Sequence, residues 1–109
     1  MNKMPENEVV VLALAGNSIK VICTKALAKQ ALVALGFTAR DEQMDRSVKD
    51  DSERRQLTLQ LISLDALFSG GPGWSPAELL GYYREQNIIT EAYRTIVWKG
   101  PGVYIIETH

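Results

Sequence analysis

Residues 8–15 form the first apolar run of the chain and contain three consecutive valines. β-branched residues favour strands, and a strand that is apolar on both faces is typical of the middle of a sheet. Gly16 and Asn17 follow, and both tolerate the positive φ angles of a tight turn. Residues 18–23 are again rich in β-forming side chains. The pattern therefore predicts an N-terminal hairpin.

A competing interpretation makes the segment after the turn helical, from Ser18 to Leu35. On a helical wheel, however, Lys20 and Lys29 would fall within the apolar side. The β-branched residues of this segment also cluster before Thr24. We therefore favour the hairpin.

Residues 25–35 are alanine-rich and predict a helix with few polar positions. Thr24 is suited to cap its start, and Gly36 is suited to the left-handed position just past its end. Phe37 would then contact Leu32, as in a Schellman closure. The small alanine side chains indicate close packing of this helix on a sheet.

Residues 40–55 are the most charged part of the chain, with six acidic and five basic residues. An acid stands four residues before a base in four pairs: Glu42/Arg46, Asp45/Lys49, Asp50/Arg54 and Asp51/Arg55. This spacing is the favourable one on a helix surface, so the segment predicts a solvated helix. Asp50 with Glu53 resembles a capping box, which allows two helices separated by a kink.

Residues 56–68 alternate at first, but Leu57, Leu61, Leu64 and Phe68 then follow the helical period. We expect a helix there. Residues 69–73 contain three glycines and a proline, which predicts a flexible connector. No Lys-Ser or Lys-Thr pair follows these glycines, so the segment lacks the pattern of a phosphate-binding loop.

Residues 75–86 begin with the strongest local signal of the chain. Ser75 is the expected cap, Pro76 lies in the first turn, and Glu78 follows three residues after the cap. Trp74 and Leu79 have the spacing of a hydrophobic staple. Gly81 is unfavourable inside a helix and indicates close packing or close approach of a partner.

Residues 92–98 and 103–108 predict a second hairpin around a Gly-Pro-Gly loop. A four-residue loop would set Trp98 opposite Val103, and a three-residue loop would set it opposite Tyr104. Both registers remain open at this point. Together the elements predict a mobile tail at residues 1–7 and a single α+β domain at residues 8–109. Its expected fold is an antiparallel sheet of two hairpins covered by three or four helices, in the order β-β-α-α-α-β-β.

Composition sets limits on location and partners. The chain has 109 residues, 46% of them hydrophobic, which suffices for a core without a metal or disulfide staple. The net charge is −1 and the sequence pI is about 5.8, so the global charge of a nucleic-acid binder is missing. With one cysteine, no membrane-length apolar run and no signal-peptide pattern, the expected location is the cytoplasm.

Groups suited to catalysis are scarce in the sequence. The single histidine is the terminal His109, and the single cysteine, Cys23, lies in an apolar strand without a nearby base. One Cys and one His cannot supply a zinc site. The adjacent acids of residues 41–42 and 50–51 each have basic partners, which disfavours a divalent-cation site. We therefore expect neither an enzyme nor a bound metal or cofactor.

Contact residues are better represented, because six of the eight aromatic residues lie in residues 70–109. Aromatic and arginine side chains are enriched at interface hot spots. The candidates for a binding surface are Tyr82, Arg84, Tyr93, Arg94, Trp98, Lys99 and Tyr104. The sequence thus favours a non-catalytic binding module, a small inhibitor, regulator or adaptor that contacts a protein partner or a second copy of itself.

Two other functions are consistent with the pattern. Helix 76–86 followed by hairpin 92–108 has the element order of a winged-helix DNA-binding regulator, although that helix offers Glu78, Arg84 and Glu85 rather than a phosphate-seeking set. A small enzyme with an Asp, Glu or Tyr site is the second alternative, and it would require a substrate-shaped pocket.

Overall fold

The computed structural model describes residues 8–23, 25–40, 43–71 and 73–109 of the chain. Over these residues it forms one sheet of seven strands and three helices. The strands are β1 (Val9–Ala13), β2 (Ser18–Cys23), β3 (Thr38–Arg40), β4 (Gln43–Ser47), β5 (Leu67–Ser69), β6 (Arg94–Gly100) and β7 (Val103–Thr108). The helices are α1 (Ala26–Ala34), α2 (Asp51–Ser63) and α3 (Pro76–Glu85).

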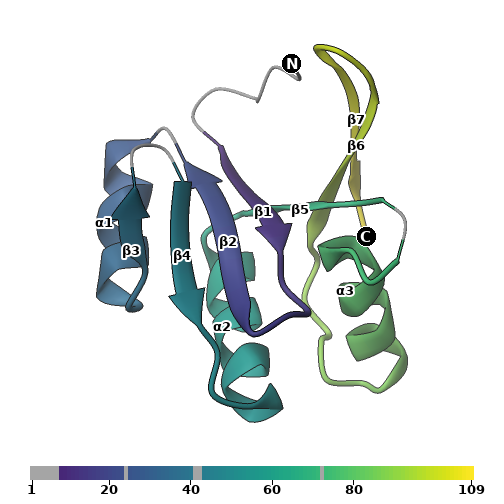
Figure 1. Cartoon of the computed structure of the whole chain (residues 1–109). Helices are drawn as coiled ribbons and strands as arrows, with labels where there is room; N and C mark the ends of the chain where they lie inside the picture. Colours follow the sequence, from purple (N-terminus) through teal and green to yellow (C-terminus); the bar gives the residue numbers. More distant parts are fainter. Residues whose placement is uncertain (1–7, 24, 41–42, 72) are drawn as a thin grey trace.

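The sheet is mixed, with the strand order β3-β4-β2-β1-β5-β6-β7 (Figure 1). β1 pairs antiparallel with β2 and parallel with β5, and β5 pairs parallel with β6. The remaining neighbours are antiparallel. The predicted antiparallel sheet is therefore wrong, and so is the predicted order, because the described chain follows β-β-α-β-β-α-β-α-β-β.

The charged segment accounts for one error. Residues 43–47 form strand β4 instead of a helix, because β4 pairs with β2 and buries Met44 completely in the core. Helix α2 begins after Asp50, the residue predicted to cap the second of two helices. The Asp50 side chain accepts a hydrogen bond from the Glu53 amide at 2.9 Å. Of the predicted helical pairs, Asp51 and Arg55 form an ion pair at 2.9 Å. Arg46 instead reaches across to Glu53 at 2.9 Å.

Strand β5 accounts for the other error. The helix expected over residues 56–68 ends at Ser63, and Leu67 and Phe68 enter the sheet between β1 and β6. Asp65, in the connection, has a positive φ of 61°. Since β5 lies between α2 and α3, the helix-turn-helix order behind the winged-helix interpretation is absent from the described chain.

Several local predictions are confirmed. Residues 18–23 form strand β2 of the N-terminal hairpin. Of the two registers left open for the second hairpin, the structure has the one that sets Trp98 opposite Tyr104. Gly36 has a φ of 95°, and the amide of Phe37 donates to the carbonyl of Leu32 at 3.0 Å, which is the Schellman closure. The tail predicted at residues 1–7, the Thr24 cap and the Glu42/Arg46 pair lie outside the described residues.

The two faces of the sheet are covered differently. Val9 and Val11 of β1 pack in one cluster with core residues of all three helices, including Leu32, Leu61 and Leu80. Val10 points to the opposite face and packs in a second cluster with Leu67 and Ile96, bordered by partly buried Leu12, Trp98 and Tyr104. Because successive side chains of a strand alternate between faces, the helices lie on the Val9 and Val11 face. None of the described helices is long and apolar enough to cross a membrane.

Candidate functional site

The candidate site lies on the outer face of α3, which begins as the sequence predicts. Ser75 caps the helix by accepting a hydrogen bond from the Glu78 amide at 3.3 Å, and Pro76 occupies the first turn. One face of α3 carries Glu78, Gly81, Tyr82 and Glu85, which follow the helical repeat. Trp74, just before the cap, lines the same surface. Leu79, Leu80 and Tyr83 on the other side are buried in the core. This burial fixes which face of α3 is presented to solvent.

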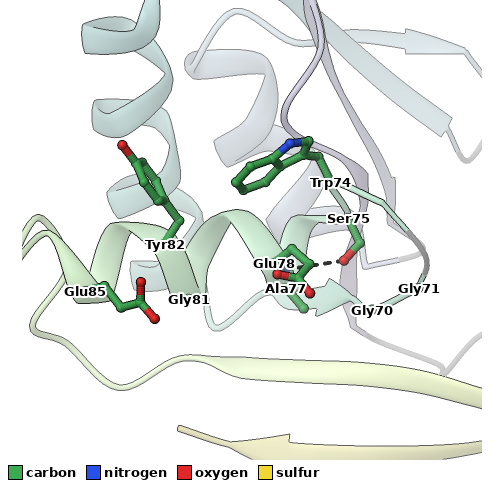
Figure 2. Close-up of a pocket in the computed structure, with 9 residues that line it drawn as sticks. All are labelled: Gly70, Gly71, Trp74, Ser75, Ala77, Glu78, Gly81, Tyr82 and Glu85. Carbon is green, nitrogen blue, oxygen red and sulfur yellow. Dashed lines mark hydrogen bonds between the residues drawn. The ribbon is translucent and has the colours of Figure 1, made fainter.

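A groove of about 410 Å³ runs along this outer face (Figure 2). It is lined by Gly70, Gly71, Trp74, Ser75, Ala77, Glu78, Gly81, Tyr82 and Glu85. A Cβ atom added at Gly81 would meet no atom within 4 Å, so no other part of the described chain presses on the helix there. Of the two explanations for Gly81 suggested by the sequence, close internal packing is therefore wrong. The open surface leaves room for an external group.

Two aromatic rings dominate the groove. The ring centroids of Trp74 and Tyr82 lie 6.0 Å apart with an interplanar angle of 85°, which is the edge-to-face geometry that aromatic pairs prefer. Yet Trp74 is 62% exposed and Tyr82 is 45% exposed. Side chains of this size usually bury most of their surface, so the pair forms an apolar contact surface that faces solvent.

The charge of the groove has a single sign. Its only charged lining residues are Glu78 and Glu85, both exposed. Figure 2 shows both carboxylates on the helix that carries Tyr82, with Trp74 on the segment that leads into it. The groove therefore combines aromatic faces with negative charge, and both attract cations.

Trp74 also lines two neighbouring hollows. One is apolar and is formed with Ala15, Leu79 and Tyr82. The other lies where the parallel strands β1 and β5 end, and its walls are residues 12–16, 69–71 and 74–76. Ligands of open α/β sheets commonly bind at such carboxyl ends. Here the polar side chains are already engaged, since Ser69 donates to the Val11 carbonyl at 2.8 Å and Ser75 caps α3.

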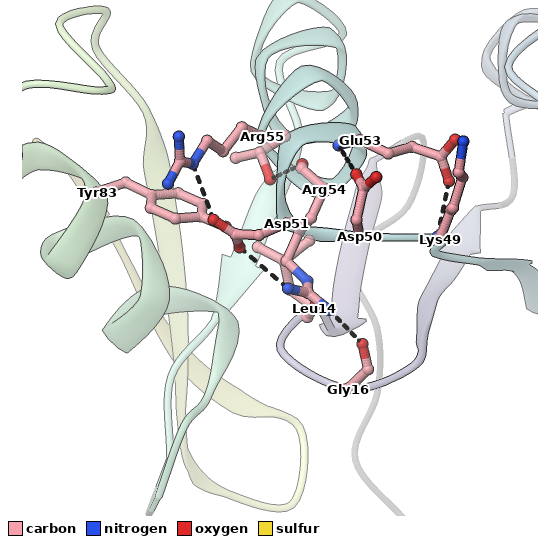
Figure 3. Close-up of polar contacts among 10 residues, drawn as sticks. Leu14, Gly16, Lys49, Asp50, Asp51, Glu53, Arg54, Arg55 and Tyr83 are labelled. Atoms are coloured by element: carbon pink, nitrogen blue, oxygen red, sulfur yellow. Dashed lines mark hydrogen bonds and ion pairs between the residues drawn. The ribbon is translucent and has the colours of Figure 1, made fainter.

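A polar network behind the groove holds α2, α3 and the end of β1 together (Figure 3). Arg54 of α2 donates through Nε to the Leu14 carbonyl at 2.9 Å and through its terminal nitrogen to the Gly16 carbonyl at 2.7 Å. Asp51 accepts from Arg54 at 3.1 Å and from the Tyr83 hydroxyl of α3 at 2.9 Å. The network fixes the position of α3, and hence of the groove, relative to the sheet.

The network changes the pKa values of Tyr83 and Asp51. Burial raises the pKa of Tyr83 to about 12, and the hydrogen bond that Tyr83 donates to the Asp51 carboxylate acts in the same direction. Burial alone would raise the pKa of Asp51. The hydrogen bonds from Tyr83 and Arg54, together with the charges of Arg55 and Arg54, outweigh burial and hold the pKa of Asp51 below its ordinary value. The pair is therefore a neutral phenol donating to a charged carboxylate, which is a structural arrangement.

The seven residues that the sequence nominates for binding do not form one patch. Only Tyr82 lies in the groove. Tyr93 is buried, contacts Phe68 edge to face and stacks on His109, while the Arg84 guanidinium lies 4.6 Å from its ring centre. The structure thus brings Arg84 and Tyr93 together as a packed pair rather than as part of the groove.

The other four candidates lie on β6 and β7. Arg94 contacts Glu8 at 2.7 Å and Asp65 at 3.1 Å, so its charge ties the start of the described chain to β6. Trp98 and Tyr104 lie side by side on the sheet face opposite the helices, with ring centroids 6.5 Å apart. Lys99 is exposed near the turn of the hairpin.

Sequence reasoning assigned Trp74 only a packing role and did not connect it with Glu78, Gly81 and Glu85. The signal was present, because these residues and Tyr82 recur at helical spacing on one face. What the sequence did not provide was the exposure of Trp74, since a staple residue is ordinarily covered by its own helix.

Little in the described chain offers catalytic chemistry. Cys23 is fully buried, and its Sγ lies 3.4 Å from the Lys25 carbonyl. The His109 ring contacts the Thr95 hydroxyl at 2.9 Å and stacks on Tyr93. No group of three His, Cys, Asp or Glu side chains within the described ranges is arranged to hold a metal ion.

No known protein family matches the chain, and neither a curated protein sequence nor a solved structure matches it. Inferences about function consequently rest on the geometry of the groove and the sheet.

Replacing Arg54 by Ala should lower the free energy of unfolding by about 1.5–3 kcal/mol, because two carbonyl groups at the end of β1 lose a charged donor. Arg55→Ala is the matched control. Among the described residues, Arg55 makes only the ion pair with Asp51, and losing it should cost less than about 0.5 kcal/mol. Urea denaturation of both variants at neutral pH measures the difference. An equal decrease in the free energy of unfolding in both variants would show that the hydrogen bonds from Arg54 to the two carbonyls do not stabilise the fold.

Replacing Tyr83 by Phe should change how stability depends on alkaline pH. The folded chain holds the Tyr83 proton more tightly than the unfolded chain, whose tyrosine has the ordinary pKa of 10.0. The stability that this difference provides is complete below pH 10.0 and is lost as the pH rises toward about 12. Stability curves of Tyr83→Phe should lack this loss, and those of the control Tyr82→Phe should keep it. Identical alkaline profiles for all three proteins would contradict the assignment.

Proposed function

We propose that the protein is a non-catalytic binding module that holds a basic side chain of a partner protein, an arginine in particular, in the groove of α3. The single observation that carries the proposal is the exposed Trp74–Tyr82 pair beside a groove whose only charged side chains are acidic. Trp and Tyr are also the residues most enriched in interface hot spots.

The chemistry of the groove favours a cation over other ligands. A guanidinium or ammonium group is attracted by the faces of Trp and Tyr rings, and the carboxylates of Glu78 and Glu85 add to that attraction. The same two carboxylates would repel phosphate and other anions. The groove therefore gives no support to the nucleic-acid alternative.

Arginine fits better than lysine for a geometric reason. Its guanidinium is planar, stacks on aromatic rings and can donate to a carboxylate through two nitrogens at once. The apolar hollow formed by Ala15, Leu79 and the two rings lies next to the acidic groove. A partner segment with an arginine beside an apolar residue would fill both, and this is the ligand class we assign.

Binding can be tested with a short peptide in which leucines flank an arginine, and with the same peptide carrying neutral citrulline. In an amide NMR titration, the arginine peptide should shift the Trp74 indole and Gly81 signals with a dissociation constant on the order of 1 mM. The citrulline peptide should bind at least about tenfold more weakly, because it lacks the charge for the cation–π contact. Higher salt should weaken only the arginine peptide.

Variants separate the groove from the rest of the surface. Trp74→Ala and Tyr82→Ala should each weaken binding by about tenfold or more, as hot-spot residues do. The double variant Glu78→Gln with Glu85→Gln should remove the salt dependence. Leu27→Ala is the control, since Leu27 is 71% exposed on α1 and lies outside the groove. Equal binding of both peptides, or loss of binding in the Leu27 variant alone, would overturn the proposal.

A further inference from the structure

Strand β7 is a free edge of the sheet. It lies at the end of the strand order and pairs only with β6 among the described strands (Figure 1). The opposite edge, β3, has three residues and carries Arg40, whereas β7 has six residues and contains neither lysine nor proline. Natural proteins usually protect edges by short strands, lysine, proline or bulges, because an open edge can pair with another chain. Apart from the irregularity of β6 opposite Val103, the first residue of β7, the described strand lacks these protections.

The hydrogen bonds of β7 define which backbone groups are free. Tyr93 and His109 exchange both of their backbone hydrogen bonds, at 3.2 Å and 2.8 Å. In an antiparallel pair such exchanges occur at every second residue, so Glu107 and Ile105 also direct their N–H and C=O groups toward β6. It follows that Tyr104, Ile106 and Thr108 direct theirs away from the sheet.

The side chains of the same strand are apolar on both faces. Val103 is 57% exposed, Ile105 is 46% exposed and Ile106 is 40% exposed. Glu107 is the only charged residue within β7. Free backbone groups and uncovered apolar side chains therefore occur on the same strand, which is the combination that strand addition requires.

We propose that β7 pairs antiparallel with β7 of a second copy of this chain, with the two-fold axis beside Ile105. This surface is separate from the groove of α3, so the inference does not depend on the proposed function. The two sheets would then be continuous through the dimer, in an isologous contact in which each copy supplies the same strand.

The register follows from the side chains. With the axis at Ile105, Tyr104 of one copy exchanges backbone hydrogen bonds with Ile106 of the other, and the two isoleucines at position 105 face each other. Aromatic and β-branched residues are favourable cross-strand pairs. An axis at Glu107 would instead set two carboxylates opposite one another. An axis at Ile106 would set Glu107 opposite Ile105 and lose the Tyr104 to Ile106 pair.

Charge complementarity supports a second copy as the occupant. In the register centred on Ile105, Glu107 of the second copy lies opposite Val103, and Val103 pairs with the end of β6 beside Lys99. Lys99 is exposed and stands at the irregularity of β6 between Trp98 and Gly100, next to the residue that pairs with Val103. The two charged residues are then two strands apart, or roughly 10 Å between Cα atoms, which their long side chains can span. Within one copy, neither residue forms an ion pair with another described residue.

Sedimentation velocity from about 1 µM to about 500 µM tests the pairing, because a contact smaller than a standard interface should dissociate in the micromolar range. The wild type should convert from monomer to dimer within this range. Lys99→Glu and Glu107→Lys should each weaken the dimer about tenfold, since each places like charges together on both sides of the axis. The double variant K99E/E107K should restore the wild-type affinity within about twofold.

Two further variants complete the test. Ile106→Pro removes an outward amide without removing a bond to β6, so it should abolish the dimer while the far-UV spectrum and the unfolding transition persist. Lys25→Glu changes the net charge as Lys99→Glu does, but it lies near α1 and should leave the dimer intact. A monomer at every concentration, a dimer that tolerates Ile106→Pro, or single charge variants that the double variant does not rescue would overturn the inference.

Discussion

The structure depends on the burial of the three valines of strand β1, Val9, Val10 and Val11. Val10 and Val11 have almost no exposed surface, and β1 has a hydrogen-bonded neighbour on each side, β2 and β5. Where β1 ends, the Leu14 side chain is buried, and a carbonyl shielded from water needs a donor because an unpaired one is costly. Arg54 supplies that donor at the part-buried Leu14 carbonyl and a second one at the exposed carbonyl of Gly16 in the turn. Through Asp51 it also contacts Tyr83 of α3. The central strand, α2 and α3 are thus positioned by one side chain.

Features coded by neighbouring residues could be predicted from the sequence. The caps at Asp50 and Ser75, the closure at Gly36 and the two hairpins all depend on residues a few positions apart. Strand β4 could not be predicted in this way. Its charge spacing satisfies a helical surface, and only the pairing with β2, which buries Met44, decides for a strand. Long-range burial outweighed a local preference worth a few tenths of a kcal/mol per ion pair.

The same distinction explains how much of the candidate site was predictable. The start of α3 and the helical spacing of its outer face are local, and the sequence carries both. Whether that face is open depends on where β5 and α2 lie, and strand β5, with three residues, is too short to have a pattern of its own. Its parallel pairing with β1 and β6 determines that Leu79 and Tyr83 turn inward while Trp74 and Tyr82 turn outward.

The pairing of β1 with β5 has a consequence for how the chain folds during synthesis. β1 is made early and pairs locally with β2, but its second neighbour follows more than fifty residues later, as the 58-residue separation of the Ser69 to Val11 hydrogen bond indicates. Arg94 and Glu8 are 86 residues apart. Contacts this distant in sequence slow folding, because the intervening chain must lose conformational freedom before they form. Until β5 leaves the ribosome, the most hydrophobic strand of the protein has an unpaired side.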